Sequence, residues 1–560
     1  GPAVTTTRHL SDSDRHDMDI AWDVEVPLSD GGSLRANVYR PRIAQRVPAI
    51  VTMGPYSKDL PMSVTYPEAW TRLVHDHPDV LGGSSGRYVV WEVPDPERWT
   101  PHGYAVVHID ARGTGRSPGV WAPFSPRESL DFAEAVEWLA AQEWCTGKVG
   151  VLGVSYHAMA AWRVAERQPP HLAAVIPWFG SGDFYREALR HGGVLSNTFI
   201  DAWWYRWVEN QHGAMTGRRS PFTGDSSTGP EQLDRAELER LREDLPSEAR
   251  SHPLLDDWGA DRAVDWSRVT VPFLSVGNWG TVGLHLRGNV EAFRRAASKE
   301  KWLLLLDAHG PGIDRFLGDD GLTMQLRFFD HYLKDVANDW TSQPRVSVEV
   351  PGDGSTTTPR TATRWPLDDT RWTRLHLDAS DQTMAEDPSG RSAQTMYWPS
   401  SGGVTFRCDP FAGRTEIVGP LALHLQVSTE ADDLDVFASV RSIDRDGRPA
   451  GASALGWLRL SHRELDEPAS TEWSPVHDHR HTCEVGRGER YAIDVELWPA
   501  ALVIPPGGRL LLTVGGGDTF ATGEWRHNDS ADRPNATFAG WATIFSGPEA
   551  PSWLLVPVSS

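Results

Sequence analysis

The 560-residue sequence predicts two domains of different class: an α/β domain built on a mostly parallel sheet, followed by an all-β sandwich of jelly-roll type. From Asp19 to about Lys334, short apolar runs alternate with helix-like segments, as in a parallel sheet covered on both faces. After about Gln343 the hydrophobic pattern changes to period two. The length also exceeds the ~250–300 residues at which a single core stops growing. We therefore predict an α/β domain over residues 1–345 and a sandwich over 346–560.

Six apolar runs in the first domain have the length and composition of buried strands. They are Val47–Met53, Tyr104–Ile109, Val149–Leu152, Ala173–Pro177, Val271–Val276 and Trp302–Leu306. A helix is predicted over Leu130–Gln142, because Phe132, Ala135, Val136 and Leu139 share one face.

The strand rhythm stops between residues 183 and 265, where we predict a helical cap inserted over the carboxyl edge of the sheet. The cap is Trp-rich at Ala202–Trp207, which either lines a pocket or fills the core of the cap. Its charged run, Glu231–Glu243, is typical of a solvated helix face. Arg186 and Arg206 either attract a substrate carboxylate or form surface salt bridges.

The second domain shows the alternation of half-buried strands. Leu421, Leu423, Leu425 and Val427 alternate with polar or small residues, and the same pattern recurs over Ile493–Leu497. Turns such as Pro505–Gly508 separate the runs, as in antiparallel sandwiches. The Gly-, Thr- and Pro-rich stretch Pro351–Thr363 is interpreted as the connection into this domain.

Composition excludes several partner classes. The 54 Lys and Arg against 76 Asp and Glu give a formal charge of −22, which repels nucleic acid and anionic membrane surfaces. No run reaches the ~18 apolar residues of a membrane helix, so a cytoplasmic location is expected. Cys145, Cys408 and Cys483 are too few and too scattered for a zinc cluster, although Cys408 and Cys483 could pair.

The chemistry is concentrated at one turn. The predicted strand Val149–Leu152 runs directly into Gly153-Val-Ser-Tyr-His157 and then into a helical segment. This is the strand–turn–helix of a nucleophile elbow in the α/β-hydrolase fold, with Ser155 as nucleophile and Tyr156 N–H as an oxyanion donor. His157 replaces the usual second glycine and is interpreted as a packing residue, because a side chain two positions after the serine points elsewhere.

The general base is predicted at His309. In this fold the chain order is Ser, then Asp or Glu, then His, and the histidine lies on the loop after the last strand. His309 follows the run Trp302–Leu306 closely, and Gly310-Pro-Gly312 provides a tight loop behind it.

These motifs together resemble those of the cocaine esterase-like (CocE/NonD) hydrolases and the related X-Pro dipeptidyl-peptidases, along nearly the whole chain. The segments that carry the resemblance are Gly54–Asp59, Asp110–Ser117, Gly153–Tyr156, Ser181–Arg186, Phe328–Lys334, Gly419-Pro420, Asp435–Phe437, Glu496–Pro499 and Gly507–Leu510. The resemblance implies that Ser155 is the nucleophile, His309 the base, and Tyr156 N–H and the Tyr56 hydroxyl the oxyanion donors.

The chain departs from that family at the catalytic acid. The loop where the family places its aspartate reads Gly277-Asn-Trp-Gly-Thr-Val-Gly283, with no carboxylate. Asp183, just beyond the preceding strand, could orient His309 instead, or it could cap a helix. Asn278 could orient a neutral imidazole, and a Ser155–His309 dyad without an acid is also open.

The sequence thus predicts a serine hydrolase that cleaves an ester or amide bond through an acyl-enzyme, with a small ester, amide or peptide-like substrate. No metal or organic cofactor is expected. Alternatives that stay open are an acyltransferase, a peptidase, and a catalytically silent binding protein that keeps the fold. The sequence also leaves a homodimer open.

Overall fold

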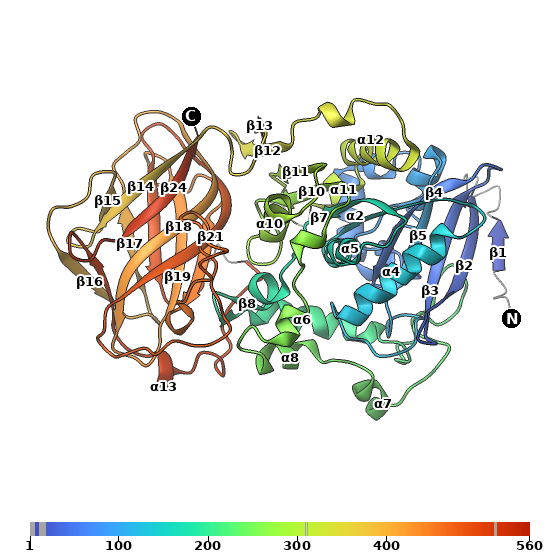
Figure 1. The fold of residues 1–560 in the computed structure, drawn as a ribbon, viewed down its shortest axis with the longest axis horizontal. Helices are drawn as coiled ribbons and strands as arrows, with labels where there is room; N and C mark the ends of the chain where they lie inside the picture. The colour runs from blue at the N-terminus through green and yellow to red at the C-terminus, as the bar shows by residue number, and fades with distance from the viewer. Residues whose placement is uncertain (1–5, 10–17, 309, 311, 520–522, 560) are drawn as a thin grey trace.

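The computed structural model describes residues 6–9, 18–308, 310, 312–519 and 523–559. Figure 1 shows two lobes side by side, an α/β lobe that carries the N-terminus and a β lobe that carries the C-terminus. Each lobe is built on its own sheet, so the predicted fold class is confirmed.

The first sheet has the strand order β1-β2-β3-β5-β4-β6-β7-β10-β11-β12-β13. Its strands are β1 (Thr6–His9), β2 (Met18–Pro27), β3 (Ser33–Pro41), β4 (Val47–Gly54), β5 (Ala105–Asp110), β6 (Cys145–Val154), β7 (Leu172–Trp178), β10 (Phe273–Asn278), β11 (Lys301–Leu306), β12 (Val346–Pro351) and β13 (Thr357–Ala362). Strands β5 to β12 in this order run parallel, and the strands at both edges are antiparallel. All six predicted strands of this domain are present.

Helices cover both faces of this sheet. On one face, α4 (Pro126–Ala140), α5 (Tyr156–Arg167) and α10 (Arg287–Arg295) contribute to the core. The other face is covered by α1 (Met62–Thr65), α2 (Pro67–Asp76), α3 (Pro96–Trp99), α11 (Ile313–Leu317) and α12 (Asp319–Lys334). The predicted helix over Leu130–Gln142 corresponds to α4, which begins after the N-cap Ser125 with a proline at its first position.

The segment predicted as a cap consists of short elements. They are a π-helix (Tyr185–Leu189), β8 (Arg190–His191), β9 (Val194–Leu195), α6 (Asn197–Trp207), α7 (Arg235–Arg240), α8 (Leu245–Ser251) and α9 (Asp257–Ala260). The charged run forms only α7, a helix with no buried residue that lies at the margin of the α/β lobe (Figure 1). This confirms its interpretation as a solvated face.

The second sheet closes on itself, because β24 pairs with both β14 and β18. Its strands are β14 (Thr370–Asp378), β15 (Thr383–Ala385), β16 (Ala393–Tyr397), β17 (Gly403–Arg407), β18 (Thr415–Thr429), β19 (Asp435–Ile443), β20 (Ala454–Arg459), β21 (Tyr491–Ile504), β22 (Arg509–Gly515), β23 (Ala542–Ser546) and β24 (Trp553–Ser559), with one short helix, α13 (Asn535–Phe538). The alternating runs at Leu421 and Ile493 lie in β18 and β21, and their apolar side chains fill this core. Short 3-10 turns complete both lobes: η2 (Pro78–Leu81), η3 (Thr100–His102), η5 (Val208–Asn210), η6 (Trp266–Arg268), η7 (Trp340–Ser342) and η8 (Leu460–His462).

Within the stretch interpreted as a connection, Pro351–Thr363, residues Thr357–Ala362 form strand β13, which pairs antiparallel with β12. A proline lies within it, at position 359, and β13 is the last strand of its sheet. An edge strand tolerates proline because one of its sides makes no ladder hydrogen bonds. The first sheet therefore continues beyond residue 345, where we placed the end of the first domain, as far as Ala362.

A shared core joins the two lobes. Side chains of α10, β11 and β12 pack with side chains of the second sheet in one buried cluster, whose aromatic members are Trp279, Phe293, Trp365, Phe437, Trp457 and Trp498. Across the same boundary, buried Arg287 forms an ion pair with Glu496 of β21 at 2.7 Å, and within the first lobe it pairs with Glu187 at 2.6 Å. The lobes are thus held by both apolar and ionic contacts.

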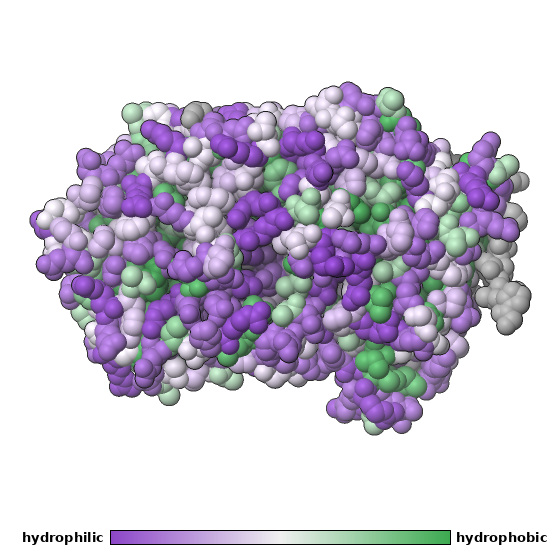
Figure 2. Space-filling view, viewed as in Figure 1, coloured by the Kyte–Doolittle hydropathy of each residue, from purple (hydrophilic) through white to green (hydrophobic). Residues whose placement is uncertain are grey.

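The three cysteines are all free, so the Cys408–Cys483 pair that the sequence left open is not formed. None of the described helices is both long and apolar enough to span a membrane. Figure 2 shows one face of the molecule with hydrophilic residues over most of it and hydrophobic residues scattered among them.

Candidate active site

Ser155 occupies a strained turn between β6 and α5. Its backbone has φ 60° and ψ −108°, in the region where φ is positive and side chains are uncommon. The turn is held on both sides, because Ser155 N–H donates to the Trp178 carbonyl at 2.9 Å and Val154 N–H donates to the Glu92 carbonyl at 3.0 Å. This geometry is that of the predicted nucleophile elbow, and it leaves the serine side chain half-buried at the sheet edge.

The position of His157 requires that residue 153 has no side chain. A Cβ atom at Gly153 would lie 2.3 Å from the Cβ of His157, and one at Gly54 would lie 2.4 Å from the imidazole Cε1. His157 is buried, and burial lowers its pKa to about 3. Its ring fills the space beneath the elbow, as the packing interpretation predicted.

A histidine that we did not predict lies against Ser155. The Nε2 atom of His285 is 2.9 Å from Ser155 Oγ, within hydrogen-bonding distance. His285 stands on the loop between β10 and α10, which is the loop where the resembled family carries its acid. No signal in the sequence points to His285, because an isolated histidine in an irregular loop matches no motif.

Several contacts fix the loop that carries His285. At its start, Trp279 Nε1–H donates to the Glu349 carbonyl at 2.8 Å. In its middle, a Cβ at Gly283 would lie 3.0 Å from the Cβ of Trp525, so the second lobe packs closely here. At its end, Arg287 makes the ion pairs described above. The imidazole is therefore carried by a loop anchored at three points.

The environment of His285 favours the neutral ring. Burial is the one cause that shifts its pKa, and it lowers the pKa to about 3. Its Nδ1 atom is buried and has no hydrogen-bond partner among the described residues. A neutral imidazole with the proton on Nδ1 presents its Nε2 lone pair to the Ser155 hydroxyl.

Two groups can stabilise an oxyanion next to Ser155. Tyr156 is the first residue of α5, so its N–H has no carbonyl one turn earlier in the helix to bond. The Tyr56 hydroxyl oxygen accepts a hydrogen bond from Trp203 Nε1 at 3.1 Å, which leaves its own O–H free to donate elsewhere. Burial holds the pKa of Tyr56 well above its usual range, so the phenol stays protonated.

The other predicted site residues lie as follows. Asp183 accepts from Arg186 N–H at 3.0 Å and forms an ion pair with the guanidinium of Arg186 at 2.8 Å, the arrangement of a local cap. Its role toward a histidine stays a prediction. His309 lies outside the described residues, so its role as base also stays a prediction.

Asn278 links two loops of the site. Its Oδ1 atom accepts from Gly280 N–H at 3.0 Å and from Ala308 N–H at 3.3 Å. Its Nδ2 atom is buried without a partner among the described residues. The amide therefore ties the His285 loop to the end of the segment that follows β11.

The Trp-rich stretch of α6 covers the elbow. Trp203 stacks on Tyr156 with ring centroids 6.0 Å apart, and Trp207 meets Tyr56 at 4.6 Å. Trp204 and Trp207 are buried and Trp203 is half-buried in one hydrophobic cluster, so the stretch fills a core beside the elbow, which is the second of the two alternatives. Arg206 lies 4.0 Å from the Tyr66 ring as a cation–π contact, and Arg186 is taken by its ion pair.

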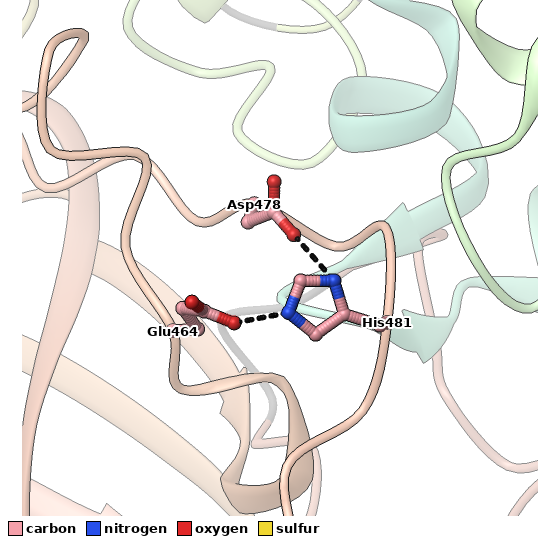
Figure 3. A group of neighbouring side chains, drawn as sticks. All are labelled: Glu464, Asp478 and His481. Atoms are coloured by element: carbon pink, nitrogen blue, oxygen red, sulfur yellow. Dashed lines mark hydrogen bonds and ion pairs between the residues drawn. The ribbon is translucent and has the colours of Figure 1, made fainter.

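One group outside this site has residue types that bind metals. Figure 3 shows His481 between Glu464 and Asp478, on loops of the second lobe. Its Nδ1 atom lies 3.3 Å from Asp478, and its Nε2 atom bonds Glu464. Both ring nitrogens are engaged and two of the three side chains are exposed, which describes a surface ion-pair group; we assign it no metal.

Comparison with known proteins assigns the family. Residues 30–310 match the X-Pro dipeptidyl-peptidase (S15 family), and residues 338–555 match the X-Pro dipeptidyl-peptidase C-terminal non-catalytic domain. The chain belongs to the S15 family. This membership confirms the resemblance inferred from the motifs, and the S15 match spans both the elbow and the His285 loop.

Relatives cover almost all of this S15 chain. Cocaine esterase of Rhodococcus sp. (strain MB1 Bresler) is 26% identical over 96% of this chain and 98% of the esterase. The structure of a CocE/NonD family hydrolase from Staphylococcus aureus is 32% identical, covers 97% of this chain and 94% of its own, and has a TM-score of 0.83. An α-amino acid ester hydrolase, 16% identical with a TM-score of 0.70, shares the fold.

These findings together establish the reaction class. The S15 chain is a serine hydrolase that acts on ester or amide bonds.

Proposed function

We propose that this S15 hydrolase cleaves its substrate through an acyl-enzyme formed on Ser155. The observation that carries the proposal is the hydroxyl of Ser155 on a strained elbow, 2.9 Å from an imidazole nitrogen. A serine held by a neighbouring imidazole is activated because its proton has an acceptor as the oxygen attacks.

In the first step Ser155 Oγ attacks the substrate carbonyl carbon, and the proton leaves for an imidazole. The carbonyl oxygen takes the negative charge and is stabilised by Tyr156 N–H and by the Tyr56 O–H. The tetrahedral intermediate collapses, and the alcohol or amine departs with the proton. Water then attacks the Ser155 ester, the acid is released, and the serine recovers its proton.

The surroundings favour a substrate with an apolar acyl group and no net charge beside the carbonyl. Tyr56, Tyr156 and Trp203 lie in or against one cluster of aromatic and aliphatic side chains that also contains Trp207 and Leu284. The nearby cations are engaged, because Arg186 and Arg206 make local contacts. We therefore propose a small ester or amide whose acyl part packs on aromatic rings.

A fluorophosphonate probe with mass spectrometry tests the nucleophile. We expect covalent labelling at Ser155 in the intact protein, together with hydrolysis of p-nitrophenyl esters. Both should be absent in Ser155→Ala, while Ser220→Ala, a buried serine outside the site, should label normally. Labelling of Ser155→Ala at the same rate would overturn the proposal.

A second measurement tests the acyl preference. We expect kcat/KM to rise along a series of p-nitrophenyl esters from acetate to phenylacetate, because a larger apolar acyl group buries more area against the rings. Higher kcat/KM for a succinate monoester, whose acyl group carries a charge, would contradict the proposed preference.

A further inference from the structure

We propose that His285 is the proton acceptor for Ser155, in place of a histidine on the loop after the last strand. The proposal rests on the Ser155 nucleophile argued above and assigns the group that activates it. It differs from the prediction made from chain order, which placed the base at His309.

The first argument is geometric. The distance of 2.9 Å between His285 Nε2 and Ser155 Oγ is that of a formed hydrogen bond, so the reacting groups already meet. Two other groups of this loop are engaged elsewhere: Thr281 Oγ1–H donates to the Asn278 carbonyl at 3.1 Å, and Arg287 N–H donates to the His285 carbonyl at 2.9 Å. Among the described residues, the imidazole of His285 is the group that contacts the Ser155 hydroxyl.

The second argument is that the loop holds the ring without a carboxylate. His285 precedes Leu286, which has φ 74° and caps α10 without a side-chain hydrogen bond. A branched residue with positive φ is strained, and such strain persists where the surrounding structure fixes it. Here the fixing contacts are the ion pairs of Arg287 and the packing of Leu284 in the aromatic cluster. Packing can therefore orient the ring, a task that an acid performs in a triad.

The third argument explains the missing acid. The loop that carries an aspartate in the resembled family here presents an imidazole two residues beyond Gly283. If His285 is the base, an acid that orients a histidine on the loop after β11 is not required. The absence of a carboxylate on this loop and the contact between His285 and Ser155 are then both explained by a base that has moved to this loop.

The proton transfers balance as follows. As the Ser155 Oγ–carbon bond forms, the Oγ–H bond breaks and the proton moves to Nε2 of neutral His285, which becomes an imidazolium. The carbonyl π electrons move to the oxygen. When the intermediate collapses, the leaving oxygen or nitrogen takes that proton and His285 is neutral again. A water molecule repeats the sequence in deacylation.

Site-directed variants test the assignment. We expect His285→Gln to lower kcat/KM for p-nitrophenyl acetate by about 10³–10⁴-fold, because the glutamine amide keeps a polar group near Ser155 but cannot take a proton. His75→Gln, an exposed histidine on α2, is the matched control and should keep full activity. Melting temperatures of both variants report folding, and crystallography or circular dichroism of His285→Gln guards against a misfolded variant.

The comparison with His309→Gln decides between the two histidines. The proposal requires the larger loss of fluorophosphonate labelling in His285→Gln. It is overturned if His285→Gln folds and labels at near the wild-type rate while His309→Gln does not. Failure of labelling in the wild-type protein would overturn the Ser155 nucleophile instead, so the two proposals fail separately.

The pH profile of kcat/KM distinguishes a proton-accepting role of His285 from a purely structural role. Burial lowers the pKa of His285 to about 3, and no charged group of the described residues contributes to the shift. The wild-type kcat/KM should therefore change less than about twofold between pH 7 and pH 5. An ordinary histidine base with a pKa of about 6.5 would give a loss of roughly 25-fold, and that result would contradict the assignment.

Discussion

Trp203 donates its indole N–H to the hydroxyl oxygen of Tyr56 across 3.1 Å, so one residue of α6 aims the hydroxyl of a residue that follows β4. The two rings also meet edge to face, with centroids 6.4 Å apart. Because the oxygen is occupied as an acceptor, the Tyr56 proton is available to a developing oxyanion. The contact couples the cap segment to the proposed oxyanion site.

Replacing Tyr56 by Phe removes that donor and little else. We expect kcat/KM to fall by about 10²–10³-fold, as for loss of one oxyanion-hole donor, with the melting temperature nearly unchanged. Trp203→Phe keeps an aromatic ring and removes only the aiming hydrogen bond, so a loss of about tenfold or less is expected. Equal activity of Tyr56→Phe and wild type in steady-state assays would exclude Tyr56 from the oxyanion site.

Replacing Gly153 by Ala tests the packing beneath the elbow. The added Cβ would lie 2.3 Å from the Cβ of His157, so the turn or α5 must move. We expect a destabilisation of roughly 1–3 kcal/mol and a large loss of activity. Gly402→Ala is the control, since nothing lies within 4 Å of a Cβ there. Chemical denaturation of both variants measures the difference, and equal stability would show that the elbow relaxes freely.

The raised pKa of Glu128 predicts that the stability of the protein depends on pH. Burial raises its pKa to about 7 from 4.5, although hydrogen bonds from the Tyr156 hydroxyl at 2.7 and 2.9 Å act in the opposite direction. The unfolded chain loses this proton near pH 4.5 and the folded chain near pH 7, so stability falls as pH rises through that window.

Glu128→Gln lacks this titration. The free energy of unfolding of the variant minus that of wild type should therefore increase from pH 4.5 to pH 7, by on the order of 3 kcal/mol. Denaturant unfolding at several pH values measures it. A difference that stays constant across the window would show that Glu128 titrates normally in the folded protein.

Arg287→Met tests the ionic link between the lobes. It leaves the carboxylates of Glu187 and Glu496 without their cation, which in a buried pair costs about 3–5 kcal/mol. Arg235→Met breaks the exposed pair with Glu239 and should cost about 0.5 kcal/mol or less. We also expect the first variant to lose activity more steeply than stability, because Arg287 anchors the His285 loop. Equal stability of the two variants in thermal unfolding would contradict the anchoring role.

The sequence predicted the elbow at Ser155 better than it predicted the side chains that contact Ser155. The elbow at Ser155 can be recognised from the sequence because its strand, glycine, serine and helix are contiguous. His157 belongs to the same contiguous segment, and its interpretation as a packing residue is correct. His285 was missed because its meeting with Ser155 spans 130 residues and depends on how an irregular loop is anchored. No periodicity reports such a contact.

Strand β13 was missed for a different reason. The glycines of Pro351–Thr363 lie between β12 and β13, as turn signals do, whereas Pro359 lies within β13. Proline is tolerated on an edge strand, and only the sheet order shows that this segment is at an edge. The partner of Asp183 was likewise beyond pattern reasoning. Its bond to Arg186 is local, but the sequence fits a cap and a catalytic acid equally well.

The close approach of Gly283 to Trp525 has a consequence for how this protein can be changed by recombination. A β lobe taken from another chain would need an aromatic ring that fits against Gly283. It would also need a carboxylate opposite Arg287. Exchange of the C-terminal half between relatives would thus disturb the loop that carries His285. We therefore expect the residues at the contact between the two lobes to change together in evolution.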